Sequence, residues 1–149
     1  MMRARIAMVV VTLVVASPAA VDAGAEGRVV VEVHGLRSVR GQVRAGLFEH
    51  TGTWLREGHE RARCRVDVTA RIARCSFGTL PPGRYALSLM HDEDGDGELD
   101  RDFFGVPTEG FAFSNDAPVG LGGPPSFERA CFAHREEDEI VRVAARYGL

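Results

Sequence analysis

Hydrophobic and polar residues alternate with a period of two along most of the chain. Residues 28–34 place three valines on one side, and residues 41–48 repeat the alternation. Successive side chains of a strand point to opposite faces of a sheet, so this period predicts half-buried antiparallel strands. The other stretches with strand character are 64–68, 72–77, 84–91, 127–133 and 140–147. About seven strands in a chain of this size predict an all-β fold, an antiparallel β-sandwich.

Two connections between these strands carry signals of their own. The short turn at residues 69–71 predicts a hairpin between the strands on either side of it. Residues 53–61 combine Trp54 and Leu55 with a run of charged side chains, and we expect a short helix or an irregular crossover there.

The most specific motif follows directly after the strand at 84–91. Residues 92–100 read Asp-Glu-Asp-Gly-Asp-Gly-Glu-Leu-Asp, so carboxylates alternate around a glycine. Like charges held together in a folded loop repel one another, and a hard divalent cation offsets that repulsion. Calcium loops of the EF-hand type take oxygens from positions 1, 3, 5, 7 and 9, with glycine at position 6. The corresponding ligands are Asp92, Asp94, Asp96, the backbone carbonyl of Glu98, and Asp100.

The loop differs from an EF-hand in two respects. Phe103 stands at position 12, where an EF-hand has a bidentate glutamate, and a strand rather than a helix leads into the loop. The missing ligand must come from Asp102, from Glu109 or from water, and we include Glu109 among the predicted metal ligands. We therefore predict a structural Ca²⁺ ion; the alternative is a solvated acidic turn without metal.

The N-terminal sequence predicts export. Basic residues precede an apolar run at residues 6–16, and small residues lead to a cleavage site after Ala23. We predict a signal peptide at residues 1–23 and a single β-sandwich domain at residues 24–149, periplasmic or secreted. The apolar run is short for a membrane span, so no span is expected after cleavage, with a retained anchor as the alternative. Outside the cytoplasm, calcium can fill a site with a dissociation constant on the order of 0.1–1 mM.

Charge and cysteine content bear on the class of partner and on disulfide formation. The chain has 18 basic and 21 acidic residues, and its arginines are scattered rather than arranged in a stripe, so no nucleic-acid partner is expected. In an exported protein two of the three cysteines should pair. A Cys64–Cys75 disulfide is favoured because these residues flank the predicted hairpin, and a Cys75–Cys131 bridge between sheets is the alternative.

A second unusual segment follows the acidic loop. It contains four phenylalanines among glycines and prolines, at positions 103, 104, 111 and 113. This composition forbids long regular structure but is too apolar for a mobile linker, so we predict one long ordered loop packed on the sandwich. Its aromatic side chains either plug the open end of the sandwich or line a ligand pocket beside the metal.

No common catalytic motif is present. The sequence lacks a Gly-x-Ser-x-Gly elbow, a His-Glu-x-x-His helix and a phosphate-binding glycine loop. The best enzymatic candidate is His91 beside the acidic loop, acting with Glu109 and a metal-bound water. We expect instead that His91 packs at a strand end or hydrogen-bonds a loop carboxylate. The protein is therefore predicted not to be an enzyme, with a metal-dependent hydrolase as the alternative.

Three longer motifs resemble a known family. They are residues 91–100, residues 104–115 (Phe-Gly-Val-Pro-x-Glu-Gly-Phe-x-Phe-Ser-Asn) and residues 123–132 (Gly-Pro-Pro-Ser-Phe-Glu-x-Ala-x-Phe). Together they are similar to the exported bacterial domain-of-unknown-function family 2141. Residues 80–86 also resemble transthyretin-like and carboxypeptidase-regulatory-like modules. The resemblance implies an exported immunoglobulin-like or transthyretin-like β-sandwich without an assigned activity.

These inferences combine into one expectation about function. The chain should be an exported, non-enzymatic module whose acidic loop binds calcium and orders the segment that follows it. The surface shaped in this way is expected to serve an envelope, polysaccharide or protein partner.

Overall fold

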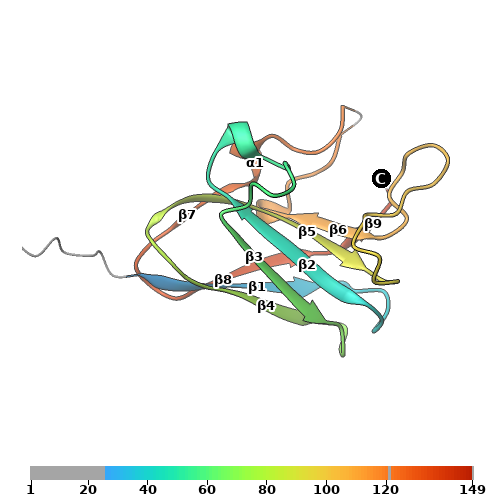
Figure 1. The fold of residues 1–149 in the computed structure, drawn as a ribbon, viewed down its shortest axis with the longest axis horizontal. Coiled ribbons are helices and arrows are strands. Elements are labelled where there is room, and N and C mark those ends of the chain that lie inside the picture. The colour runs from blue at the N-terminus through green and yellow to red at the C-terminus, as the bar shows by residue number, and fades with distance from the viewer. Residues whose placement is uncertain (1–25, 121, 149) are drawn as a thin grey trace, which may run out of the picture.

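The computed structural model describes residues 26–120 and 122–148, which form two β-sheets packed face to face (Figure 1). The smaller sheet has the strand order β4-β1-β8, and the larger has the order β3-β2-β5-β6-β9, with β7 also paired to β5. The strands are β1 (Gly27–His34), β2 (Gln42–Phe48), β3 (Ala62–Asp67), β4 (Ala73–Leu80), β5 (Gly83–Asp92), β6 (Gly110–Phe113), β7 (Cys131–His134), β8 (Glu139–Ala144) and β9 (Arg146–Tyr147). The predicted all-β sandwich is confirmed.

The main hydrophobic core lies between the two sheets. Alternation along β1, β2 and β5 directs every second side chain inward, as the period of two predicts. The fully buried residues of this core include Val29, Val31, Val33, Val43, Leu47, Tyr85 and Leu87. Burial of these side chains removes apolar surface from water and holds the sheets together.

A second, smaller cluster lies on the outer face of the larger sheet. It gathers the buried residues Phe48, Ala86, Phe111, Phe113, Ala117, Phe127 and Ala130. The short helix α1 (Phe127–Ala130) covers part of it, and the Ser126 hydroxyl accepts a hydrogen bond from the Arg129 amide at the start of that helix. Trp54 packs edge-on against Phe48, with ring centroids 5.2 Å apart, and donates a hydrogen bond to the Pro125 carbonyl.

The predicted hairpin at residues 69–71 is wrong. Strand β3 pairs with β2 in the larger sheet, whereas β4 pairs with β1 in the smaller one, so the turn carries the chain from one sheet to the other. A turn signature does not distinguish these two outcomes, because both need a tight reversal. Cys64 and Cys75 form a disulfide with a Cα–Cα distance of 5.8 Å, and it joins the two sheets rather than two paired strands.

Three further expectations need correction. The pairing of β1 with β8 is parallel, because β8 enters the smaller sheet after a crossover from β7 in the larger sheet. Residues 127–133 are not one strand, since α1 precedes β7. The predicted loop after residue 103 contains strand β6, which the glycines and prolines around it concealed. Turns and a 3₁₀ segment at Thr51–Thr53 occupy the expected irregular crossover.

The phenylalanines after the acidic loop differ in burial. Phe111 and Phe113 are buried in the second cluster, but Phe103 and Phe104 are 97% and 85% exposed, so the prediction that all of them pack on the sandwich is wrong. Asp102 accepts hydrogen bonds from the amides of Phe104 and Val106 and thereby closes the tip that presents the exposed pair.

The segment predicted to be a signal peptide, residues 1–23, lies outside the described residues. Within residues 26–120 and 122–148, no helix is long and apolar enough to cross a membrane.

Candidate metal centre

The acidic loop begins where the central strand of the larger sheet ends. Strand β5 pairs with β2 as far as Asp92, which lies opposite Gln42. Asp92 and the preceding His91 are both completely buried, whereas Asp94 and Asp96 are exposed. The loop is therefore fixed at its first residue by a rigid strand and opens toward solvent within two residues.

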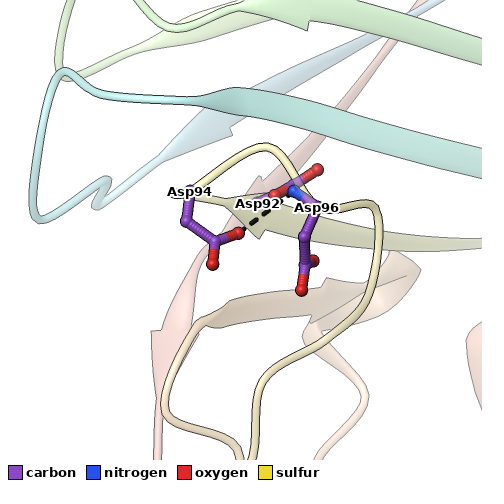
Figure 2. Close-up of side chains that lie close together, drawn as sticks. All are labelled: Asp92, Asp94 and Asp96. Atoms are coloured by element: carbon purple, nitrogen blue, oxygen red, sulfur yellow. Dashed lines mark hydrogen bonds between the residues drawn. The ribbon is translucent and has the colours of Figure 1, made fainter.

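Three of the predicted ligands converge. Asp92, Asp94 and Asp96 each place a carboxylate oxygen within 4.8 Å of the others. Figure 2 shows these side chains where the loop leaves β5, with the carboxylates of Asp94 and Asp96 directed to the same side. Oxygens at this spacing can reach one calcium ion, whose oxygen ligands lie about 2.3–2.6 Å from the metal.

Backbone amides wrap the loop around these carboxylates. Asp92 accepts from the amides of Gly95 (2.7 Å) and Gly97 (3.1 Å). Asp94 accepts from the Asp96 amide at 3.1 Å, and Asp96 accepts from the Glu98 amide at 2.8 Å. Each carboxylate thus orders the turn that presents the next one. Gly97 has φ of +89°, in the region that favours glycine, as its predicted place in the sharp turn requires.

One arginine from a neighbouring strand lies against the loop. The Nε atom of Arg44, on β2, is 3.0 Å from Oδ2 of Asp92, close enough for an ion pair although the contact lacks hydrogen-bond geometry. A side chain at position 97 would collide with this arginine, because a Cβ there would lie 2.6 Å from Nη1. Arg44 therefore neutralises part of the charge of the innermost aspartate and packs directly on the turn.

Glu109 holds the two ends of the loop together instead of joining the three aspartates. It is 4% exposed, and its carboxylate accepts from the Glu93 amide at 2.6 Å and from the Asp100 amide at 3.3 Å. Both of its oxygens are engaged by backbone groups on opposite sides of the loop. Glu98 and Asp100 are exposed, and neither belongs to the converging group. Their participation as ligands stays a prediction.

Glu93 anchors the loop to the segment between β1 and β2. Its carboxylate accepts hydrogen bonds from the Arg37 guanidinium and from the Ser38 hydroxyl. Burial by itself would raise the pKa of Glu93, but the hydrogen bonds from Arg37 and Ser38 outweigh it and hold that pKa below its ordinary value. The Glu93 side chain, between Asp92 and Asp94 in the sequence, thus ties the loop to the fold and does not face the other two carboxylates.

His91 makes hydrogen bonds within the fold. Its Nδ1 lies 2.7 Å from the Tyr147 hydroxyl, and its Nε2 lies 2.8 Å from the Arg40 carbonyl. Both ring nitrogens therefore have hydrogen-bond partners in a completely buried site. The expectation that His91 packs at a strand end agrees with this placement, although its partners are a phenol and a carbonyl rather than a loop carboxylate.

No sequence motif indicated which residues surround the loop. Arg44, Arg37 and Ser38 come from segments about 50 residues earlier in the chain, and only the pairing of β2 with β5 brings them near residues 92–97. Their contribution could have been anticipated only from a correct strand register.

The comparisons with known proteins agree with the sequence motifs. The family model described as an uncharacterized protein conserved in bacteria, DUF2141, matches residues 31–142, which include most of both sheets and the acidic loop. No curated protein and no solved structure matches the chain significantly. The resemblance predicted from the motifs is confirmed: the chain belongs to the DUF2141 family of uncharacterized bacterial proteins.

Proposed function

We propose that this chain is an exported, non-enzymatic binding module in which the loop at residues 92–100 holds a structural Ca²⁺ ion. The observation that carries the proposal is the convergence of Asp92, Asp94 and Asp96 within 4.8 Å. Among the described residues only Arg44 forms an ion pair with these three carboxylates, so about two negative charges have no arginine paired with them there. A hard divalent cation with oxygen preference fits that deficit and that ligand type.

The remaining ligands would come from the sequence positions named above. The backbone carbonyl of Glu98 and the exposed carboxylate of Asp100 follow the three aspartates at the required spacing, and water can complete about six to eight ligands. Glu109 contributes indirectly, because it ties the amides of Glu93 and Asp100 together and so keeps the loop closed. The ion would then fix the connection between β5 and β6.

A catalytic role for the same site has less support. A metal-dependent hydrolase would need His91 to handle a proton or to bind the metal, and both of its nitrogens are engaged inside the core. We therefore assign the loop a structural role, in a module that presents its surface to an envelope, polysaccharide or protein partner.

Thermal and chemical unfolding with added calcium test the proposal. For a dissociation constant of about 0.1–1 mM, 10 mM calcium should stabilise the chelator-treated domain by about 1.4–2.7 kcal/mol. The double substitution Asp94→Asn and Asp96→Asn should abolish this gain, because it removes two charges while keeping acceptors for the amides of Asp96 and Glu98.

A charge-matched control separates ligation from general electrostatics. Glu136→Gln with Glu137→Gln removes the same charge from an exposed turn, so this variant should keep the full response to calcium. The absence of any stabilisation of the wild-type domain at 10 mM calcium would overturn the proposal, as would an equal loss of response in both double variants.

Export is tested separately, by expressing the full chain in a bacterial host and measuring the mass of the protein in each fraction. The proposal expects a periplasmic or secreted product that begins at Gly24. An intact chain in the cytoplasm would contradict it.

A further inference from the structure

The outer face of the larger sheet contains a groove beside the acidic loop. Its volume is about 860 Å³, within the range of roughly 300–1,000 Å³ for pockets that bury a small ligand. Strands β2, β3, β5 and β6 form its floor, one wall contains Leu55 and Glu57, and the opposite wall contains Gly97, Leu99 and Arg101. We refer to this cavity as the outer groove.

The floor of the outer groove is apolar because the second hydrophobic cluster is only partly covered. Phe111 and Phe113 belong to that cluster and line the groove together with Met90. Helix α1 and Trp54 cover the other part of the cluster. A ligand in the groove would therefore cover the part of this apolar cluster that the chain itself leaves open.

The charge on the lining is opposite to that of the whole protein. Four arginines and two glutamates line the groove, whereas the chain as a whole has a net charge of −3. Glu60 holds Arg63 through two hydrogen bonds of 2.8 and 2.6 Å, and Asp92 accompanies Arg44. With these pairs set aside, Arg65 and Arg101 stand against Glu57, so the lining keeps a net positive charge.

Arg44 and Arg65 are placed side by side by the strand register. They are direct partners across β2 and β3, on the face that forms the groove. Like charges directly opposite each other in an antiparallel pair destabilise a sheet. Asp92 compensates Arg44, but among the described residues no carboxylate forms an ion pair with Arg65. An anionic group above this pair would remove the repulsion, and guanidinium groups bind carboxylate or phosphate oxygens in a planar, two-pronged geometry.

We propose that the outer groove binds a small amphipathic anion: a single-chain molecule whose apolar body lies over Met90, Phe111 and Phe113 and whose carboxylate or phosphate sits at Arg44 and Arg65. The proposal adds a second site to the binding module and does not require calcium in the loop. Its measurements are therefore made in chelator as well as in calcium, so that failure of one proposal is distinguishable from failure of the other.

The chain carries its own fluorescent reporter for this test. Trp54 is the single tryptophan, and its ring lies 5.9 Å from that of Phe113, which lines the groove. The purified domain is titrated with dodecanoate, dodecyl phosphate, dodecyl maltoside and dodecyltrimethylammonium, all below their micellar concentrations. We expect saturable binding of one or both anions, at least about tenfold tighter than that of the neutral and cationic probes, with the tighter anion identifying the headgroup.

Two variants and one matched control locate the site. Arg65→Ala should weaken anion binding about tenfold or more, and Ser88→Phe, which places a ring on the floor of the groove, should block all four probes. Arg28→Ala removes an exposed arginine from β1 in the other sheet and should leave binding unchanged. Equal binding of all four probes, no binding of either anion, or equal losses in Arg65→Ala and Arg28→Ala would each overturn the proposal.

A second copy of the chain is the competing occupant, because Phe103 and Phe104 form an exposed aromatic tip. Sedimentation of the wild-type domain and of Phe103→Ser with Phe104→Ser distinguishes the two. If the wild-type domain and the double variant are both monomers, the result supports the proposal that the occupant is a small anion. A wild-type oligomer that dissociates in the double variant and only then admits dodecanoate would overturn it.

Discussion

Carboxylates at two places in this molecule are neutralised to different extents. Glu32, on the outer face of β1, is 6% exposed and accepts hydrogen bonds from Arg74, Arg142 and His34. The acidic loop brings three aspartates together, and among the described residues only Arg44 forms an ion pair with them. Glu32 is therefore fully paired with the protein's own cations, whereas the three aspartates are only partly neutralised.

The difference follows from where the carboxylates stand in the fold. Glu32 lies on a central strand, directly opposite Arg74 of β4 and Arg142 of β8, so the register supplies a cation on each side. A loop beyond the end of a strand has no paired strand on each side, and of the three converging aspartates only Asp92 forms an ion pair with an arginine among the described residues. The position of a carboxylate relative to the sheet thus decides how many of the protein's own cations lie beside it.

The largest effect is expected from Asp92→Ala. This change removes the acceptor for the amides of Gly95 and Gly97 and leaves Arg44 without its partner. We expect a loss of about 2–4 kcal/mol in the free energy of unfolding, measured by urea denaturation without calcium. Asp100→Ala, at an exposed carboxylate of the same loop, serves as the control. Equal losses in both variants would show that Asp92 has no special role.

The next effect concerns Glu32 and how its contribution to stability depends on pH. The hydrogen bond from Arg74, with further help from His34, lowers the pKa of Glu32 from 4.5 to about 2. A carboxyl whose pKa is lowered by folding stabilises the protein fully above its ordinary pKa and loses that contribution as pH falls toward 2. Glu32→Gln should therefore be less stable than the wild type at pH 6, and the difference should shrink steadily between pH 5 and pH 2. A constant difference would contradict the assignment.

A smaller effect should appear in calcium binding by Arg44→Met. A positive charge 3.0 Å from Asp92 opposes a cation at the same carboxylate, and methionine keeps the length of the side chain without the charge. Calcium affinity should rise by roughly five- to thirtyfold, corresponding to about 1–2 kcal/mol, as measured by isothermal titration calorimetry. Arg63→Met, in the same groove but paired with Glu60, should change the affinity less. A fall in affinity would mean that Arg44 supports the metal site.

The smallest effect is a change in stability that should have opposite signs at the acidic loop and at Glu32. In chelator, Asp94→Asn with Asp96→Asn should stabilise the domain by up to about 0.5 kcal/mol, because it relieves repulsion between exposed carboxylates. Glu32→Gln should destabilise it under the same conditions. Thermal unfolding of the two variants beside the wild type gives this comparison directly. A destabilised aspartate double variant would indicate that the loop is not strained by its own charge.

Much of the fold, and the convergence of three of the six residues predicted as metal ligands, followed from local sequence patterns. The valines of β1 alternate because successive strand residues face opposite sides, and the same rule placed Tyr85, Leu87 and Leu89 in the core. The convergence of Asp92, Asp94 and Asp96 depends on spacing within five residues. Glu109 was predicted as a metal ligand, and that part stays a prediction; its hydrogen bonds to the amides of Glu93 and Asp100 could not be foreseen, because they depend on where β6 returns.

The sequence by itself therefore determined most of the strands, the family and the acidic loop, since each is encoded by the spacing of neighbouring residues. Only the tertiary structure decided which sheet each strand joins, as the crossover at residues 69–71 shows. It also decided that Glu32 meets two arginines while the three converging aspartates of the loop meet Arg44, and that Arg44 and Arg65 lie together over an apolar groove. These outcomes depend on strand register, which is fixed by burial of side chains from the whole chain at once.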